Sequence, residues 1–156
     1  MGSKSDWGVM QNVSATLDKF GIGSENRVIS AHRAPHLLAE YCESAPGRGI
    51  KILICGAGLA AALPGVAAAH TALPVLGVPL EAGQGLGGMD ALMAIVQMPP
   101  GIPVGTLAIG KAGAINAAML ATAILALSDD RIRAALDEFR ANQNQTIRDM
   151  PPPDQE

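Results

Sequence analysis

The sequence predicts an α/β fold built around a parallel sheet, and two observations predict it. The first is a set of short segments that are apolar throughout, such as "IKILICGAG" and "PVLGVPL", without the alternation of a strand that has one face in water. The second is that helical patterns lie between these segments. Apolar strands that alternate with helices are typical of a parallel sheet covered on both faces by right-handed crossovers. In such sheets ligands bind at the carboxyl ends of the strands, so we expect the functional site there.

The individual elements follow from local patterns. Apolar residues at spacings of three and four predict a helix over 6–20, with Asp6 as its cap. A short β-branched run predicts a strand over 27–30, and a proline at a tolerated first-turn position predicts a helix over 35–44. The other expected elements are strands over 50–58, 74–80 and 104–110, a glycine-rich loop over 81–88, and helices over 59–70, 89–97, 114–127 and 130–147.

The length of 156 residues fits one domain. We expect residues 1–148 to form a single α/β nucleotide-binding domain. The tail "MPPPDQE" cannot continue a helix, so residues 149–156 are expected to be disordered.

The composition limits the partners of this chain. Hydrophobic residues make up 49% of it and charged residues only 16%, which favours a homo-oligomer that covers part of its own surface. A net charge of −3 gives no general attraction for nucleic acid or anionic lipid. The longest apolar run, "GAINAAMLATAILAL", is shorter than the roughly 20 residues of a membrane span. We therefore expect a cytoplasmic protein, with Cys42 and Cys55 as reduced, buried thiols.

The stretch "GSKSDW" lies at the start of the first expected helix. Free N–H groups at a helix start, together with the hydroxyls of Ser3 and Ser5, suit a phosphate group, and Asp6 suits sugar hydroxyls. The same residues are also common helix caps, so a purely structural interpretation stays open.

The stretch "SAHRAP" follows the next expected strand and has a similar arrangement. Ser30 supplies a hydroxyl, and Arg33 supplies a planar, bidentate partner for phosphate. His32 carries the side chain that most readily exchanges a proton near neutral pH. We expect Arg33 to hold an anion and His32 to move a proton, while a structural histidine bonded to a loop carbonyl is the alternative.

The stretch "GAGLAAALPG" brings backbone close to a ligand or a packed neighbour, since its glycines bracket a strand-to-helix turn. The third glycine of a dinucleotide fingerprint is missing at Ala61, and no acid lies at the right distance. We therefore exclude a nicotinamide site.

Taken together, "MGSKSD", "SAHRAP", "GAG…LPG", "LPVLGVP" and "GIPVGTLAIG" resemble, in this order, one family. It is the 5-(carboxyamino)imidazole ribonucleotide mutases of purine biosynthesis, also described as the catalytic subunit of phosphoribosylaminoimidazole carboxylase. The resemblance implies a flavodoxin-like three-layer α/β/α sandwich, an octamer, and transfer of a carboxylate from the exocyclic nitrogen of an imidazole ribonucleotide to ring carbon 4. It implies no metal and no organic cofactor.

The resemblance also implies roles for particular residues. The general acid/base would be His32. The substrate-binding residues would contact phosphate, carboxylate or ribose through side chains or backbone, and they are Ser3, Ser5, Asp6, Ser30, Arg33, Gly56, Ala57, Gly58 and Leu63.

The sequence departs from the family pattern in three places. Leu59 occupies the position of a glycine and Ala62 that of a histidine in the family pattern. The loop over 81–88 is longer than the family's loop and carries Glu81. The family's first strand, which is central in the order 2-1-3-4-5, is absent from this chain. We predict that an upstream segment supplies it or that neighbouring elements compensate. These departures keep two alternatives open: a carboxylase or decarboxylase of the same fold acting on a related ribonucleotide, and a nucleotide-phosphate binder without catalysis.

Overall fold

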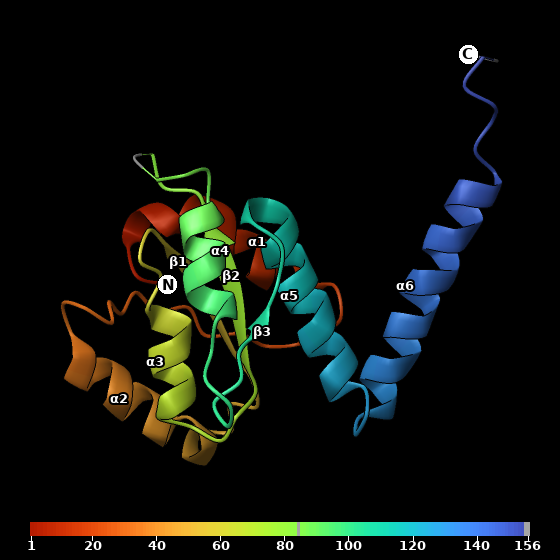
Figure 1. Ribbon diagram of the computed structural model, residues 1–156. Coiled ribbons are helices and arrows are strands. Elements are labelled where there is room, and N and C mark those ends of the chain that lie inside the picture. The colour runs from red at the N-terminus through yellow and green to blue at the C-terminus, as the bar shows by residue number, and fades with distance from the viewer. Residues whose placement is uncertain (84, 155–156) are drawn as a thin grey trace.

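The computed structural model describes residues 1–83 and 85–154, and Figure 1 shows their arrangement. The strands are β1 (Leu53–Gly58), β2 (Val75–Leu80) and β3 (Gly105–Thr106). The α-helices are α1 (Trp7–Asp18), α2 (Pro35–Ser44), α3 (Leu63–Ala69), α4 (Met89–Val96), α5 (Gly110–Leu125) and α6 (Asp130–Arg148), and two 3₁₀ turns are η1 (Lys4–Asp6) and η2 (Pro46–Arg48). Each predicted helix is therefore present, with shifts at its ends.

The sheet is parallel, in the order β1-β2-β3, and separates two layers of helices. Its register pairs Leu53 with Val75 and Leu76 with Gly105. Because side chains alternate along a strand, Val75 packs into the core under α2, α3 and α4, while Leu76 packs into the core under α1 and α5. The predicted three-layer α/β/α fold is confirmed.

Two predicted strands are much shorter or absent. Residues 27–30 form no strand, because among the described residues their backbone bonds only to Met1 and, at Ser30, to Ala34 of the turn that follows. The strand predicted over 104–110 is reduced to β3, since helix α5 already begins at Gly110.

The turn after β1 delays the next helix. Leu59 and Ala61 have positive φ angles of 54° and 37°, which non-glycine residues rarely adopt. Helix α3 therefore begins at Leu63 rather than at Leu59, where the sequence predicted it. The glycines of the segment predicted a strand-to-helix turn, but the apolar residues after Gly58 did not show how far it extends.

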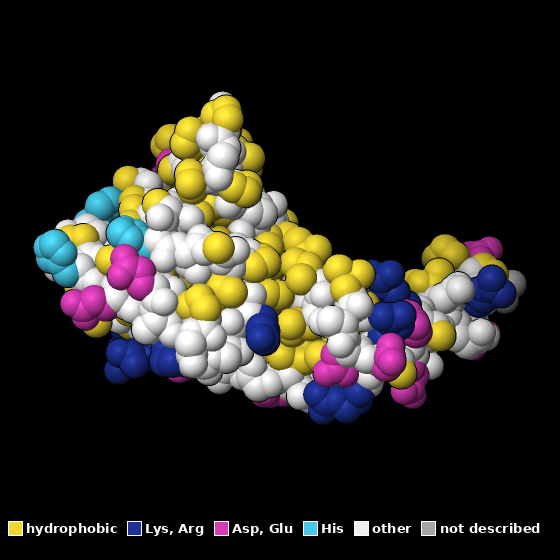
Figure 2. Space-filling model, turned by 90° about the horizontal axis from the view of Figure 1, so that it is seen from below, with side chains coloured by type: hydrophobic (Ala, Val, Ile, Leu, Met, Phe, Trp, Pro, Cys, Tyr) yellow, Lys and Arg dark blue, Asp and Glu magenta, His cyan; other side chains and the backbone are white. Residues whose placement is uncertain are grey.

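Helix α6 extends away from the body of the molecule (Figure 1). At its base Ile132 and Leu136 are buried, and Phe20 packs edge-on against Phe139 with ring centroids 5.4 Å apart. Figure 2 shows hydrophobic side chains gathered in the hollow between the body and α6. Among the described residues, none of the helices has the length and hydropathy needed to cross a bilayer.

The two cysteines are buried, as predicted, and give a simple test of the core. Burial raises the pKa of the Cys42 thiol and raises that of Cys55 to about 12. Because the thiolate is the reactive form, we expect neither thiol to react with Ellman's reagent near about pH 8 in the native protein, and both to react in guanidinium. Fast labelling of the native protein would show that this core is open.

Candidate functional site

The first loop of the site surrounds η1, and hydrogen bonds among its own residues hold it. The Ser3 amide donates to Asp6 Oδ2 at 2.8 Å, the Ser5 amide donates to Ser3 Oγ at 3.3 Å, and the Ser5 hydroxyl donates to the same oxygen at 2.8 Å. This is a capping box in which Ser3 caps η1, whereas Asp6, predicted to cap the following helix, lies at the N-cap of α1 without a side-chain bond to it. The Ser5 side chain is nevertheless exposed, and the Ser3 and Asp6 residues are only partly buried. Polar atoms on this loop therefore remain within reach of a ligand.

The second loop is a tight turn from Ser30 to Ala34. The Ala34 amide donates to the Ser30 carbonyl at 2.9 Å, and the Arg33 amide donates to Ser30 Oγ at 3.2 Å. Arg33 Nε donates to the same hydroxyl oxygen at 3.3 Å. The turn thus fixes both the backbone and the guanidinium of Arg33.

Arg33 also joins the two loops. Its Nη2 donates to the Gly2 carbonyl at 3.2 Å, so the guanidinium bridges segments that are 31 residues apart in the sequence. Of the five N–H donors on a guanidinium, these two bonds use one on Nε and one on Nη2. The exposed Arg33 therefore still presents donors toward solvent at the junction of the loops.

His32 lies in the same turn and is exposed. In the described part of the chain its ring has no hydrogen-bond partner, which argues against a structural histidine held by a loop carbonyl. The imidazole is accessible beside the guanidinium that bridges the loops.

The glycines at the end of β1 are required by packing. A Cβ on Gly56 would collide with the Met10 side chain, and one on Gly58 would lie 3.1 Å from the Leu80 carbonyl oxygen. Their lack of a side chain is thus explained without a ligand. The carboxyl ends of β1 and β2 lie at one edge of the sheet, because the two strands are parallel.

Leu63 lies apart from the exposed loops. Its side chain is 4% exposed and packs in the core under α3, so it can present only backbone atoms to a ligand. Ala57 is likewise buried in that core.

Sequence reasoning missed one member of the site, the Gly2 carbonyl that receives the Arg33 guanidinium. A backbone carbonyl leaves no signal in residue type, so only the structure reveals it. Within residues 1–83 and 85–154 no group of three or more His, Cys, Asp or Glu side chains is placed to hold a metal ion.

Comparison with known proteins finds a matching family model, similar proteins from other bacteria and a solved structure of the same fold. A family model described as "AIR carboxylase" matches residues 1–146. The N5-carboxyaminoimidazole ribonucleotide mutase of Pseudomonas aeruginosa is 55% identical over 153 residues, covering 98% of this chain and 93% of that protein. The protein of the same name from Bacillus subtilis is 52% identical over 147 residues, covering 94% and 90%. The crystal structure of Treponema denticola PurE superposes with a TM-score of 0.84 at 26% identity, covering 94% and 90% of the two chains.

Proposed function

This chain belongs to the AIR carboxylase family, and on that premise we propose that it is an N5-carboxyaminoimidazole ribonucleotide mutase of purine biosynthesis. The reaction moves a carboxylate from the exocyclic nitrogen of the ribonucleotide to ring carbon 4. The observation that carries the assignment to these residues is the bridge from Arg33 to Gly2, which joins the loop of the exposed Ser5 to the turn of the exposed Arg33 and His32.

The two loops form the anion-binding part of the proposed site. The chain has a net charge of −3, so attraction for a substrate phosphate must be local. Arg33 supplies it with donors left free by its bonds to Ser30 and Gly2. The Ser5 hydroxyl would add a further polar contact, and Asp6 would accept from the ribose hydroxyls.

Replacing Arg33 with Lys is expected to weaken ribonucleotide binding by roughly 10–100-fold, because a lysine ammonium cannot bridge Ser30 and Gly2 and still present a planar fork. Calorimetric titration with aminoimidazole ribonucleotide measures the change. Arg140→Lys, on the exposed face of α6, is the matched control and should leave affinity unchanged. Equal affinities for the two variants would remove Arg33 from the site.

The proposed chemistry needs a proton carrier and a closed volume. The bond between the exocyclic nitrogen and the carboxyl carbon breaks, and the released carbon dioxide is held beside the electron-rich ring until carbon 4 attacks it. Carbon 4 then carries both a proton and the new carboxylate. His32 gives a proton to the nitrogen as the carbon dioxide leaves and then takes the proton from carbon 4, which restores both the aromatic ring and the starting state of the imidazole.

A second candidate function is carboxylation of aminoimidazole ribonucleotide by free carbon dioxide. The matching family model is described as a carboxylase, which favours this function. Two residues near the end of β1 also differ from the family pattern. Leu59 places an exposed apolar side chain in the turn after β1, and Ala62 supplies no polar group there. The family pattern has a glycine and a histidine at these two positions, so both differences alter the region proposed to hold the migrating carboxylate.

One assay separates these functions. The protein is given the carbamate form of the ribonucleotide, or aminoimidazole ribonucleotide with bicarbonate, and the carbon-4 carboxylate is followed in each case. Turnover of the carbamate alone supports the mutase, and turnover that requires bicarbonate supports the carboxylase. Tight ribonucleotide binding without product in either mixture would assign the chain to binding without catalysis.

We further propose a cytoplasmic homo-octamer. Large apolar side chains are exposed on several elements of the single chain, among them Trp7, Leu86, Met89, Met93, Val96 and Leu120. Subunit contacts would cover such a surface. Light scattering coupled to gel filtration tests the subunit number, and a monomeric mass would contradict the proposal.

A further inference from the structure

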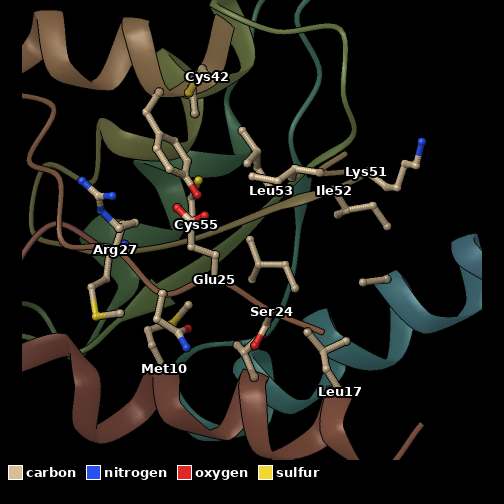
Figure 3. A pocket seen from close by; sticks show the side chains of 18 of the residues that line it. Met10, Leu17, Ser24, Glu25, Arg27, Cys42, Lys51, Ile52, Leu53 and Cys55 are labelled. Atoms are coloured by element: carbon tan, nitrogen blue, oxygen red, sulfur yellow. Dashed lines mark hydrogen bonds between the residues drawn. The ribbon is translucent and has the colours of Figure 1, made fainter. Parts of the chain in front are cut away.

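Two of the departures from the family pattern lie next to each other in the structure. One is in the turn between β1 and α3, residues 59–62, and the other is the loop between β2 and α4, residues 81–88. Because β1 and β2 are parallel neighbours, both segments begin at the same edge of the sheet. None of their described residues lines the pocket of about 500 Å³ between α1 and α2 (Figure 3). Any joint role of the two segments therefore depends on their contact with each other.

The two segments touch at two points. A Cβ on Gly58, the last residue of β1, would lie 3.3 Å from the Ala82 Cβ. A Cβ on Gly85 would lie 3.4 Å from Leu59 Cδ2 and 3.2 Å from the Ala82 carbonyl oxygen. Asp90 Oδ2 closes the same space at 2.9 Å. The loop therefore lies so close to the turn that a side chain at Gly85 would displace its neighbours, and Leu59 forms one wall of this space.

Side-chain packing, rather than backbone hydrogen bonding, joins the two segments. The Gly85 amide donates to the Ala82 carbonyl at 2.7 Å, and the Met89 amide donates to the Leu86 carbonyl at 3.2 Å, so these bonds stay within the loop or lead into α4. Among the described residues, no backbone hydrogen bond runs from the loop to residues 59–62. The position of the loop against the turn therefore depends on van der Waals contacts, to which Leu59 contributes.

Leu59 is strained in a way that core packing does not explain. Its φ angle is 54°, in the left-handed region that favours glycine. Its side chain is 49% exposed and belongs to none of the core clusters, so burial does not offset the strain. Strain that the core does not explain points to a role for the residue at that position. The contact beside Gly85 is the interaction that a glycine at position 59 would lose.

We propose that Leu59 is a positioning residue: its side chain holds the 81–88 loop against the end of β1, and through the loop it sets how well the site retains carbon dioxide. The second part rests on the proposed function, in which the backbone of residues 56–58 lies beside the migrating carboxylate. Carbon dioxide is small and uncharged, so it escapes unless packed groups cover it until carbon 4 attacks. Because Ala82 lies against Gly58, moving the loop away would uncover that end of the strand.

The test changes the contact from each side. Leu59→Gly removes the side chain, and Gly85→Ala pushes a methyl group against it. Gly83→Ala is the matched control in the same loop, because nothing lies within 4 Å of a Cβ placed there. Each protein is given ribonucleotide labelled with ¹³C in its carbamate carboxyl, together with unlabelled bicarbonate. We expect the first two variants to raise the unlabelled fraction of the product by roughly tenfold, and Gly83→Ala to leave it unchanged. Equal fractions in all variants would overturn the proposed effect on retention.

Hydrogen exchange tests the contact without any turnover. The amides of Gly85 and Met89 should lose at least about tenfold protection in Leu59→Gly, and Leu59→Met, which keeps an apolar side chain of similar volume, should restore protection and label retention together. Unchanged protection in Leu59→Gly would show that Leu59 does not hold the loop. If the unmodified protein itself gives only unlabelled product, the mutase function and the effect on retention both fail, while the protection measurements still decide whether Leu59 holds the loop.

Discussion

Replacing His32 with Asn is expected to lower kcat by roughly 10²–10⁴-fold, the usual contribution of a general acid/base. Asparagine has a similar size and polarity but cannot take the proton from carbon 4. Because His32 is exposed and makes no hydrogen bond to the described residues, the substitution removes no contact that holds the fold. Binding of the ribonucleotide should therefore persist. Steady-state kinetics with a separate binding titration measure the two effects.

His36→Asn is the matched control, because His36 is also exposed and lies just inside α2. It should retain full turnover. If His32→Asn also turns over at the rate of the unmodified protein, another group moves the proton. If both variants lose turnover together, the loss reflects the integrity of the 30–36 region rather than proton transfer.

Replacing Gly113 with Ala is expected to destabilise the fold strongly, by about 3 kcal/mol. Gly113 is buried in the first turns of α5, and a Cβ there would lie on the Ala108 carbonyl oxygen. A backbone atom cannot rotate aside as the end of a side chain can, so α5 would shift from its contacts with α1 and β2. Urea unfolding with an unchanged m-value measures the loss.

Gly8→Ala is the control that isolates the cause. Gly8 also lies in the first turn of a helix, α1, but nothing lies within 4 Å of a Cβ placed there. Alanine should stabilise this site by roughly 0.5–1 kcal/mol, because glycine is a poor helix residue. Opposite signs for the two substitutions are the expected result. Similar effects at both sites would mean that Ala108 moves freely.

The sequence predicted most of the fold because periodic patterns carry it. Helix α2 begins and ends where the proline and the apolar spacing placed it, and β2 matches its apolar run to within one residue. The errors arise where backbone geometry is set by tertiary contacts. The strand predicted at 27–30 needs a neighbour to pair with, and among the described residues only Met1 offers one.

In the site, too, the sequence indicated the residue types but not the backbone geometry. Residue types identified Ser30, His32 and Arg33 because hydroxyl, imidazole and guanidinium groups carry recognisable chemistry. The residue type of Leu59 argues against its positive φ angle, and only the glycine of the family pattern at this position indicated it. Which loop meets which was equally hidden, because the Arg33 guanidinium binds a backbone carbonyl at Gly2.

The most direct test of the proposed mutase activity is the fate of the migrating carbon. The protein is given ribonucleotide labelled with ¹³C in its carbamate carboxyl, in a large excess of unlabelled bicarbonate, and the carbon-4 carboxylate is examined by NMR. Transfer inside a closed site predicts that the product keeps the label. Product that carries unlabelled carbon from the solution would contradict the mutase and show a carboxylase that uses free carbon dioxide.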